Sequence, residues 1–574
     1  MSRQKDTSSS DSEYHPMSPW RFRFIVFIIL AAMAVLAGRI VYLQVVDHQF
    51  LKGQGDARTL RVETIDAHRG MITDRDGEPL AVSTPVVTLW ANPQELPDDR
   101  ATLTRLAKSL GDDPGDFINR VERYRKKSFM YLKRQVTPSP AQAVLDLGIA
   151  GVYGKHDYKR YYPTGEVTAQ LLGVTNIDDK GQEGLELAYD DYLSGTPGKR
   201  RVLKDRKGRL VRDLHLIRDA EPGGDLQLTI NLRLQYMAYR ELKAAVREHH
   251  ADAGTLVMID AHNGEVLAMA NAPSFNPNNR ANLDPAGLRN RGVTDAFEPG
   301  SVMKPLAMCA GLSSGKFTPD TVIDTSPGWM VLDHKYTIKD SLDFGKLTMT
   351  GIITKSSNIG MTHMALALPD DAIWNMYSKM GLGQEPEDIT FPGEASGSLP
   401  SPYHWSKAKR ATLAYGYGLS ASALQLAAAY TTITNDGRRV PATLFKRRSP
   451  VKGKQIVTPD VAHQVLKMME TVVEPGGSGY RAAVNGYRVA GKTGTVRKVG
   501  VEGYQRKAYR ANFLGIAPAS NPRIITMISI DNPKGKEFYG GQVSAPIFAR
   551  VAGKALRLLD VPPDNPHDNA EATR

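Results

Sequence analysis

The longest apolar stretch of the chain lies near its N-terminus. Residues 24–37 (FIVFIILAAMAVLA) are apolar without a break, and residues 40–46 continue the run after a Gly-Arg pair. As one helix the two stretches reach roughly 35 Å, which is enough to cross a bilayer. Arg21 and Arg23 precede the run and orient the N-terminus towards the cytoplasm. The pattern predicts an uncleaved signal anchor, and the alternative is a signal peptide removed near Ala37.

Beyond this run, apolar and polar residues alternate over short distances, which predicts strands and amphipathic helices. In the first half, residues 71–73 and 80–82 flank a hairpin signal at 74–77, and 100–146 contains helix-like stretches. In the second half the predicted elements are a helix over 232–249, a hairpin of 256–259 and 265–269, helical stretches over 301–385 and 403–470, strands near 487–496 and 524–530, and a helix over 545–559. This order predicts an α+β fold in which helices cover an antiparallel sheet.

A chain of 574 residues is too long for one hydrophobic core, so several domains are expected. The strongest boundary signal is Glu221-Pro-Gly-Gly-Asp225. The predicted parts are a polar tail over 1–23, the transmembrane anchor over 24–46, an N-terminal domain over 47–222, a larger domain over 223–563 and a polar tail over 564–574.

The formal net charge is +12, but Lys and Arg are scattered along the chain. A nucleic-acid-binding protein would show a basic stripe with interleaved aromatic residues, and no such stripe is present. The charge instead suits an anionic surface such as a membrane or a cell-wall polymer. The single cysteine, Cys309, excludes a disulfide framework and metal motifs built on cysteine pairs, and we expect it to be a small core residue.

The first candidate catalytic motif is Ser301-Val-Met-Lys304, which follows a Pro-Gly pair and opens a predicted helix. Spacing of i and i+3 places the serine and the lysine on one helix face. A neutral lysine there could remove the serine proton if burial and a nearby cation lower its pKa. Two other Ser-x-x-Lys segments, 313–316 and 449–452, lack this helix-start context.

The second candidate motif is Ser356-Ser-Asn358. Residues at i and i+2 do not share a helix face, so both side chains converge only if this segment is a turn between helices. A hydroxyl and a carboxamide can then relay a proton and hold a substrate amide. The alternative on local sequence is an ordinary solvated turn or helix cap.

The most specific candidate motif is Lys492-Thr493-Gly494-Thr495. On a strand, the two threonine hydroxyls share a face, and the glycine lets another backbone approach closely. The lysine supplies a cation for a substrate carboxylate. Residues 486–493 also satisfy the phosphate-loop pattern of an ATPase, but the flanking residues predict a strand rather than a loop that opens a helix.

In this order the three motifs resemble the Ser-x-x-Lys, Ser-x-Asn and Lys-Thr-Gly set of penicillin-binding proteins, with Ser357 in place of the aspartate of class A β-lactamases. Further stretches resemble the division-specific (FtsI-type) class B penicillin-binding proteins. They are RGMITDR at 69–75, RYYP at 160–163, GQEGLE at 181–186, FEPGS at 297–301 and YGYG at 415–418. The resemblance covers about residues 20–563 and implies a penicillin-binding, β-lactamase-like transpeptidase domain on an elongated, non-catalytic pedestal of the dimerisation type.

The resemblance implies peptidoglycan D,D-transpeptidation without a metal or cofactor. Ser301 would attack the penultimate residue of a D-Ala-D-Ala stem peptide, with Lys304 as base. The implied helpers are Ser356 as proton relay, Asn358 on the donor amide, Lys492, Thr493 and Thr495 on the terminal carboxylate, and the N–H groups of Ser301 and Thr495 as oxyanion hole.

The resemblance also implies partners and a location. We expect acylation by β-lactams, association with a membrane glycosyltransferase of the FtsW type and other divisome proteins, and a single-pass protein of the inner membrane. Its catalytic domain would be periplasmic, at the division septum. Three other readings remain open: an elongation-type transpeptidase, a β-lactam sensor or hydrolase, and a non-catalytic scaffold.

Overall fold

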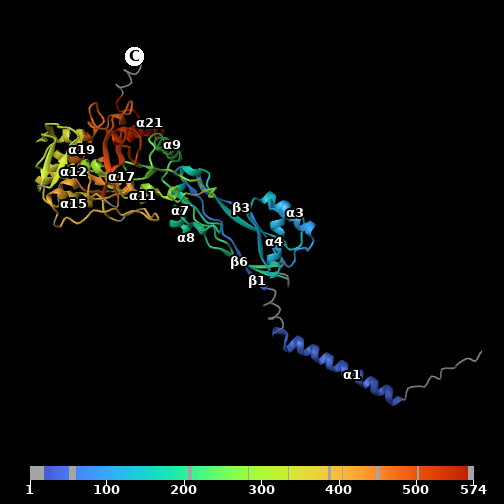
Figure 1. Ribbon diagram of the computed structural model, residues 1–574. Coiled ribbons are helices and arrows are strands. Elements are labelled where there is room, and N and C mark those ends of the chain that lie inside the picture. Colours follow the sequence, from blue (N-terminus) through green and yellow to red (C-terminus); the bar gives the residue numbers. More distant parts are fainter. Residues whose placement is uncertain are drawn as a thin grey trace, which may run out of the picture. The chain divides into compact units, whose positions relative to one another are not determined.

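A computed structural model describes residues 19–50, 60–204, 210–281, 284–333, 335–384, 389–403, 405–447, 451, 453–500 and 503–565. The chain forms two compact units (Figure 1). One unit comprises residues 1–67 and 196–221, and the other comprises residues 68–195 and 222–574. We describe each unit by itself.

The first unit contains the apolar N-terminal run and a small sheet. Helix α1 (Pro19–Val41) continues as a π-helical turn, η1 (Tyr42–Val46), and an 18-residue window within these 28 residues reaches a mean hydropathy of 2.7 with none buried. By length and composition this helix can cross a membrane, as its sequence predicts. Strands β1 (Leu60–Ile65), β6 (Gly198–Lys204) and β7 (Leu210–Arg218) form an antiparallel sheet in the order β1-β6-β7.

The second unit begins with a sheet in the order β4-β3-β2-β8, with β5 paired to β3. Its strands are β2 (Ile72–Thr73), β3 (Pro79–Ala91), β4 (Met130–Val136), β5 (Val152–Tyr161) and β8 (Leu226–Gln227). Helices α3 (Arg100–Leu110), α4 (Pro114–Tyr124) and α5 (Pro138–Leu145) pack on β3 through a separate hydrophobic core. The predicted hairpin between β2 and β3 is confirmed, with Asp74 Oδ1 accepting from the N–H groups of Asp76 and Glu78 at 2.8 and 2.9 Å.

The larger sheet of this unit has five strands in the order β10-β9-β19-β18-β17, and every neighbouring pair is antiparallel. Its strands are β9 (Ala253–Asp260), β10 (Val266–Ala272), β17 (Ala490–Gly500), β18 (Gly503–Ala517) and β19 (Ile524–Asp531). The predicted antiparallel sheet is therefore confirmed. Strand β18 was not expected, because its N-terminal half is polar and lacks the apolar alternation of a half-buried strand.

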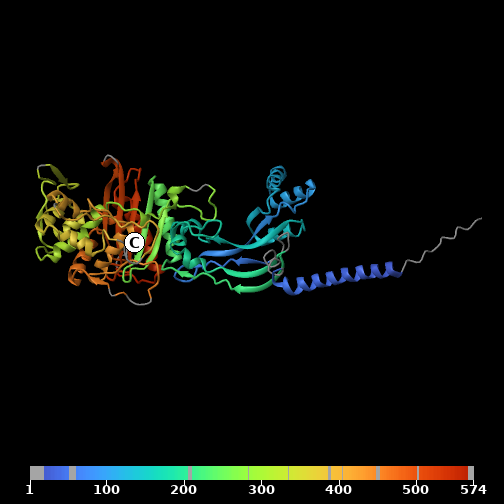
Figure 2. The same ribbon diagram turned by 90° about the horizontal axis from the view of Figure 1, so that it is seen from below.

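Helices cover both faces of this sheet (Figures 1 and 2). Helices α9 (Leu232–Glu248) and α21 (Ala545–Leu558) pack on one face around Phe548 and Leu256. Helices α11 (Arg291–Thr294), α12 (Lys304–Ser313) and α17 (Ala423–Ala429) belong to the core on the other face, with Val257 and Met527. This layered arrangement confirms the predicted α+β fold.

The remaining elements complete the second unit. The further helices are η2 (Gly165–Val167), α6 (Ala169–Leu172), α7 (Gly184–Ala188), α8 (Asp190–Ser194), α10 (Pro285–Leu288), η3 (Gly300–Met303), α13 (Met349–Lys355), α14 (Asn358–Ala367), α15 (Ala372–Lys379), α16 (Lys407–Leu413), α18 (Thr431–Thr434), α19 (Pro459–Glu470), η4 (Tyr480–Ala482) and α20 (Gly540–Val543). The further strands are β11 (Val322–Asp324), β12 (Trp329–Leu332), β13 (Tyr336–Lys339), β14 (Lys346–Thr348), β15 (Arg438–Arg439) and β16 (Lys454–Gln455). The prediction of helix throughout 301–385 is wrong for β11–β14, where β-branched residues and a Pro-Gly turn favour short strands.

A buried ion cluster lies in the second unit, between segments of its N-terminal part. Arg69, Arg160 and Glu186 are 1 %, 5 % and 0 % exposed. Glu186 accepts from Arg69 Nε at 2.8 Å and from Arg160 Nε at 2.6 Å. Arg160 also donates to the carbonyl of Gly70 at 2.8 Å. The cluster ties together three segments that lie far apart in the sequence, and each charge depends on the others for its solvation.

We expect Glu186→Ala to lower the free energy of unfolding by about 3–5 kcal/mol, because it leaves the buried guanidinium of Arg160 without a carboxylate and Arg69 with Asp190 alone, 2.7 Å away. Scanning calorimetry of the detergent-solubilised protein would measure the loss. As a matched control, Asp178→Ala removes the exposed partner of Arg134, 2.7 Å away. That change should cost less than about 1 kcal/mol. Equal effects of the two variants would contradict the role of the cluster.

Candidate active site

Ser301 lies in a 3₁₀ turn, η3, that leads directly into α12. Pro305 occupies the first turn of α12, where its missing N–H is harmless. Gly300 has φ +62°, and a Cβ at this position would lie 2.3 Å from Cγ2 of Val496 on β17. Only glycine therefore lets the turn pack this closely against the strand. Ser301 is half-buried, and its hydroxyl makes no hydrogen bond within the described part of the chain.

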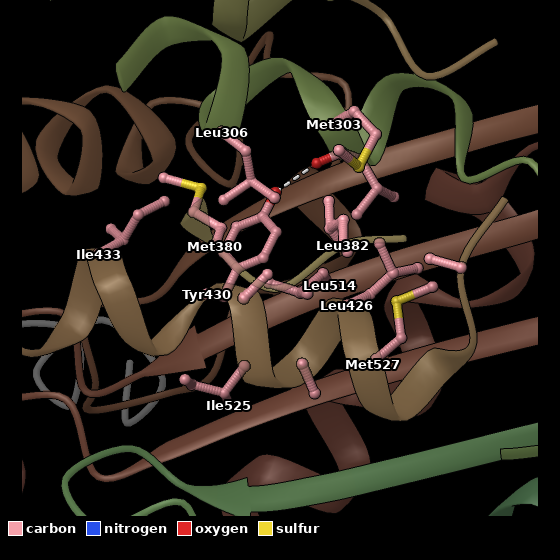
Figure 3. Packing of buried hydrophobic residues seen from close by; sticks show 14 of the residues in the cluster. Met303, Leu306, Met380, Leu382, Leu426, Tyr430, Ile433, Leu514, Ile525 and Met527 are labelled. Carbon is pink, nitrogen blue, oxygen red and sulfur yellow. Dashed lines mark hydrogen bonds between the residues drawn. The ribbon is translucent and has the colours of Figure 1, made fainter. Parts of the chain in front are cut away.

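Two buried tyrosines form hydrogen bonds to this turn from the hydrophobic core. The Tyr430 hydroxyl donates to the carbonyl of Val302, and the Tyr377 hydroxyl donates to the carbonyls of Met303 at 3.4 Å and Leu413 at 3.1 Å. Figure 3 shows Tyr430 among apolar side chains, with its hydrogen bond directed at the turn. Burial raises the pKa of both tyrosines well above their usual value, so both remain hydrogen-bond donors.

The Tyr-Gly-Tyr-Gly segment at 415–418 packs against the same turn. The N–H of Gly300 donates to the carbonyl of Gly416 at 3.1 Å. Gly416 has φ +84°, and a Cβ there would lie 2.1 Å from the Gly300 oxygen. The ring of Tyr415 lies 5.9 Å from Lys304 Nζ. A segment noted in the sequence as a family marker thus forms a wall of the site.

The structure brings Lys304 to the second motif. Its Nζ donates to the Ser356 carbonyl at 2.5 Å, to Ser356 Oγ at 3.2 Å and to Asn358 Oδ1 at 2.8 Å. Ser356 has φ +60° and ends α13, while α14 begins at Asn358. The predicted turn between two helices is therefore present. The Asn358 amide also donates to the carbonyl of Lys339 at 3.0 Å, so both ends of its side chain are engaged.

The third motif completes the cluster from β17, which is one of the two edge strands of the sheet. Lys492 is fully buried, and its Nζ donates to Ser356 Oγ at 2.9 Å and to the carbonyl of Thr493 at 3.2 Å. Gly494 faces the nucleophile turn, with Pro299 O 2.9 Å from the position of a Cβ. Thr493 shares a 3.0 Å hydrogen bond with Ser478, and Thr495 Oγ1 accepts from the N–H of Gly540 at 3.0 Å.

Two buried lysines thus converge on the single hydroxyl of Ser356. Burial lowers the pKa of Lys304 well below its usual value, and the nearby charge of Lys492 lowers it further, while Asp340 opposes the shift. Burial alone lowers the pKa of Lys492 to about 7. Because two cations this close repel, the pair favours one proton over two, which leaves a neutral amine able to accept a proton.

Asp340 is a site residue that sequence reasoning missed. It precedes the second motif in an irregular hairpin, where no local pattern marks it. Its carboxylate accepts from Ser357 Oγ at 2.5 Å and from the N–H groups of Asn358 at 2.5 Å and Ile359 at 3.2 Å. A carboxylate at the start of α14 also interacts favourably with the helix dipole. Asp340 therefore fixes the turn that presents Ser356 and Asn358.

The competing motifs lie in other environments. Ser313 is at the end of α12, and Ser449 lies outside the described residues. Lys492 and Thr493 are inside a strand, so the phosphate-loop geometry is absent from this segment. Glu394 follows the second motif in the chain and is a candidate for the base that a β-lactam hydrolase needs. Burial raises its pKa to about 7, but its N–H donates to Phe391 O, in a loop bonded to Val293 rather than to any motif residue.

Among the residues that the structure describes, no group of three or more His, Cys, Asp and Glu side chains is placed to hold a metal ion. A serine at a helix start, a lysine of lowered pKa and a shared hydroxyl are the parts of a serine acyltransferase.

Family models match most of the chain outside its N-terminal helix. Residues 64–228 match the penicillin-binding protein dimerisation domain, and residues 254–553 match the penicillin-binding protein transpeptidase domain. The chain is 44% identical to the probable peptidoglycan D,D-transpeptidase PbpC of Pseudomonas aeruginosa, over 96% of this chain and 97% of that protein. It is 42% identical to the peptidoglycan D,D-transpeptidase FtsI of Escherichia coli, over 95% and 93% of the two chains.

Solved structures agree with these matches. The apo transpeptidase domain of Burkholderia pseudomallei penicillin-binding protein 3 is 45% identical, with a TM-score of 0.54 over 59% of this chain and 97% of that one. Penicillin-binding protein 3 of Mycobacterium tuberculosis, complexed with aztreonam, is 28% identical, with a TM-score of 0.68 over 88% and 99%. The fold and sequence define a penicillin-binding protein with a transpeptidase domain. Within that class, the chain belongs to the FtsI-type class B family.

The lowered pKa values predict how acylation depends on pH. Lys304 can act as base only when neutral, so the second-order rate of acylation by a penicillin should rise as pH increases through its lowered pKa. The rate should fall again above about 7, where Lys492 loses the proton that attracts the ligand carboxylate. Stopped-flow measurement from about pH 5 to about pH 10 would give the profile.

Lys492→Arg provides the control for this profile, because a guanidinium does not titrate in this range. In this variant the decrease of the acylation rate should move to higher pH, while the increase at lower pH should stay where it is. A flat profile in the unmodified protein would contradict the assignment of the two lysines.

Asp340→Ala should slow acylation by about 5–150-fold, the effect of losing about 1–3 kcal/mol of buried hydrogen bonding at the Ser356 turn. The rate of labelling by a fluorescent penicillin measures this loss. Asp343→Ala is the matched control, because Asp343 lies in the same hairpin region and accepts only from Gly345 N–H, at 2.9 Å, among the described contacts. A loss of the same size in both variants would indicate general loosening of the hairpin.

Proposed function

We propose that this protein cross-links peptidoglycan at the division septum as a D,D-transpeptidase, through an acyl-enzyme on Ser301. The single observation that carries the proposal is the convergence of Lys304 and Lys492 on Ser356, next to the nucleophile turn. Family membership supplies the substrate, a peptidoglycan stem peptide that ends in D-Ala-D-Ala.

In the first step, Ser301 Oγ attacks the carbonyl carbon of the penultimate D-Ala while its proton moves to the neutral amine of Lys304. The backbone N–H groups of Ser301 and Thr495 stabilise the oxyanion of the tetrahedral intermediate. When the intermediate collapses, the C–N bond breaks, and a proton passes through Ser356 to the departing nitrogen of the terminal D-Ala. The products are free D-Ala and an ester on Ser301.

In the second step, an amine of a neighbouring stem peptide attacks the ester carbonyl. The amine gives up a proton to the Lys304–Ser356 pair, which returns a proton to Ser301 Oγ as the ester bond breaks. The result is a new amide cross-link and the free enzyme. Atoms and charges balance over the two steps without an added cofactor.

Substrate binding follows from the position of β17 at the edge of the sheet. An extended stem peptide can add to an edge strand through backbone hydrogen bonds. The terminal carboxylate would lie against Lys492 and the hydroxyls of Thr493 and Thr495. Asn358 would exchange its hydrogen bond to Lys339 for one to the donor amide.

The apolar helix α1 fits a single-pass anchor in the bacterial inner membrane. The arginines before it support a cytoplasmic N-terminus, with the transpeptidase domain in the periplasm. At the septum, a membrane glycosyltransferase of the FtsW type and other divisome proteins would be its partners. Midcell localisation of a fluorescent fusion supports this role, whereas side-wall localisation assigns the protein to elongation.

We expect Ser301→Ala to abolish covalent labelling by fluorescent penicillin, because the acyl-enzyme cannot form without the hydroxyl. Ser313→Ala is the control, since Ser313 belongs to a Ser-x-x-Lys segment at the end of α12. Peptide mass mapping should place the adduct on residue 301. Labelling that survives in Ser301→Ala would refute the proposed nucleophile.

The same adduct distinguishes a transpeptidase from a β-lactam hydrolase. No carboxylate among the described contacts of the three motifs is placed to aim a water at the ester, since Asp340 is held by Ser357 and by the start of α14. Intact mass followed after removal of free penicillin should show an adduct that persists. Its disappearance within seconds would assign the protein to the hydrolases.

A further inference from the structure

A hollow of about 280 Å³ lies beside the C-terminal half of β17. Its lining comes from residues 296–298, which lead into the nucleophile turn, from Ser420, from residues 496–499 of β17 and from Arg510 of β18. No residue of the three catalytic motifs belongs to this lining. We call the hollow the flanking pocket. It is available to a part of the substrate that does not itself react.

The position of the flanking pocket along β17 indicates which part of a donor peptide would reach it. In the proposed binding mode, the terminal carboxylate lies against Lys492 and Thr493, and the penultimate carbonyl accepts from the N–H of Thr495. Read from its C-terminus backwards, the peptide therefore follows β17 forwards, which is antiparallel addition to the edge strand. The penultimate residue then lies opposite Thr495, and the third residue from the C-terminus lies opposite Val496, a residue of the pocket lining.

The side chain of that third residue would project towards Arg510. Val496 is the register partner of Arg510 on β18. Residues opposite one another across neighbouring strands project from the same face of a sheet. The third peptide residue, Val496 and Arg510 would therefore form one row. Two strand spacings, about 10 Å in all, separate the ends of this row, so a long side chain is needed to span it.

Cations line the flanking pocket. Arg497 is exposed and forms no hydrogen bond or ion pair among the described residues. Lys498 and Arg510 share a single carboxylate, that of Asp531, at 2.9 and 3.3 Å. The Arg510 side chain is only 16% exposed, and its guanidinium lies 4.5 Å from the centre of the Phe297 ring. The guanidinium is thus held in a fixed place at the pocket wall.

The acidic residue of the described lining, Glu298, already has hydrogen-bond donors for its carboxylate. It accepts from the N–H of Gly418 at 2.8 Å and from the Tyr504 hydroxyl at 2.9 Å. The three cations of the lining therefore face two carboxylates, those of Glu298 and Asp531. A further carboxylate that entered the pocket would balance this charge and accept charge-assisted hydrogen bonds.

We propose that the flanking pocket binds a free carboxylate at the end of the side chain of the third residue from the C-terminus of the donor stem peptide. The inference rests on the proposed function, which supplies the peptide and its place on β17. Arg497 and Lys498 lie where the register between β17 and β18 shifts, and they would bind the carboxylate with Arg510 behind them. The enzyme would then select its donor by the charge of this side chain as well as by the D-Ala-D-Ala terminus.

The test uses full-length protein in detergent and two synthetic pentapeptide donors. A mercapto acid replaces the terminal D-Ala in both donors, so the thiol released when the thioester is cleaved measures acylation of Ser301. The donors differ only at the third residue from the C-terminus, whose long side chain ends in a carboxylate in one and in a carboxamide in the other. The carboxylate donor should react with a kcat/KM at least about tenfold higher, because it gains charge-assisted hydrogen bonds.

The double variant Arg497→Gln, Lys498→Gln should lose this preference, so that the two donors react within about twofold of each other. Arg497→Lys should retain the preference, because the ammonium keeps the charge. Lys507→Gln is the matched control, because Lys507 is exposed on β18 and lies outside the lining. It should show the full preference. The two donors are compared within each protein, so a general effect of a variant on folding or on acylation cancels.

The outcomes separate this inference from the proposed function. If neither penicillin nor either donor acylates Ser301, the proposed function is refuted and the inference falls with it. If both donors acylate Ser301 at equal rates, the flanking pocket alone is overturned. The same holds if the double variant keeps the full preference, or if a preference appears only when the fourth residue carries the carboxylate instead of the third.

Discussion

The structure of the catalytic region depends on the burial of two lysine amines beside one hydroxyl. Lys304 and Lys492 are both fully buried, and both donate to Ser356 Oγ. No carboxylate within the described residues forms an ion pair with either amine. Burial therefore lowers the pKa values of both amines. Desolvation of this kind is costly, and the surrounding packing must supply the free energy. The same desolvation leaves one amine unprotonated at neutral pH, so that it can accept a proton.

The surrounding packing explains why the site remains in place. Tyr430 and Tyr377 bond to carbonyls of the nucleophile turn from inside the core, and Asp340 fixes the turn that carries Ser356. Gly300 and Gly416 allow two backbone segments to touch where any side chain would collide. None of these residues donates or accepts a proton in the proposed reaction. They hold three sequence motifs, carried by a helix, a turn and a strand, at hydrogen-bonding distance.

The sequence predicted the parts of this site better than its connections. Helix starts, the hairpin of 256–259 and 265–269 and the strand near 487–496 follow from local periodicity and turn residues, and the structure has β9, β10 and β17 at these places. Strand β18 was missed because its N-terminal half is polar. This half pairs with β17 outside the helix-covered part of the sheet, so it lacks the apolar alternation of a half-buried strand. Asp340 and the Arg69–Glu186 cluster were missed because their contacts are long-range. Nothing near Arg69 in the chain indicates that its partner lies 117 residues away.

The environment of Cys309 has a practical consequence for spectroscopy. The thiol is completely buried in α12, burial raises its pKa to about 12, and the chain has no other cysteine. The native protein therefore offers no thiolate to a maleimide or a nitroxide reagent. A cysteine introduced at an exposed position would carry the only probe. One such label on β7 and another on α4 would report, in a native membrane, the separation between the two units and its change when the cleft is acylated.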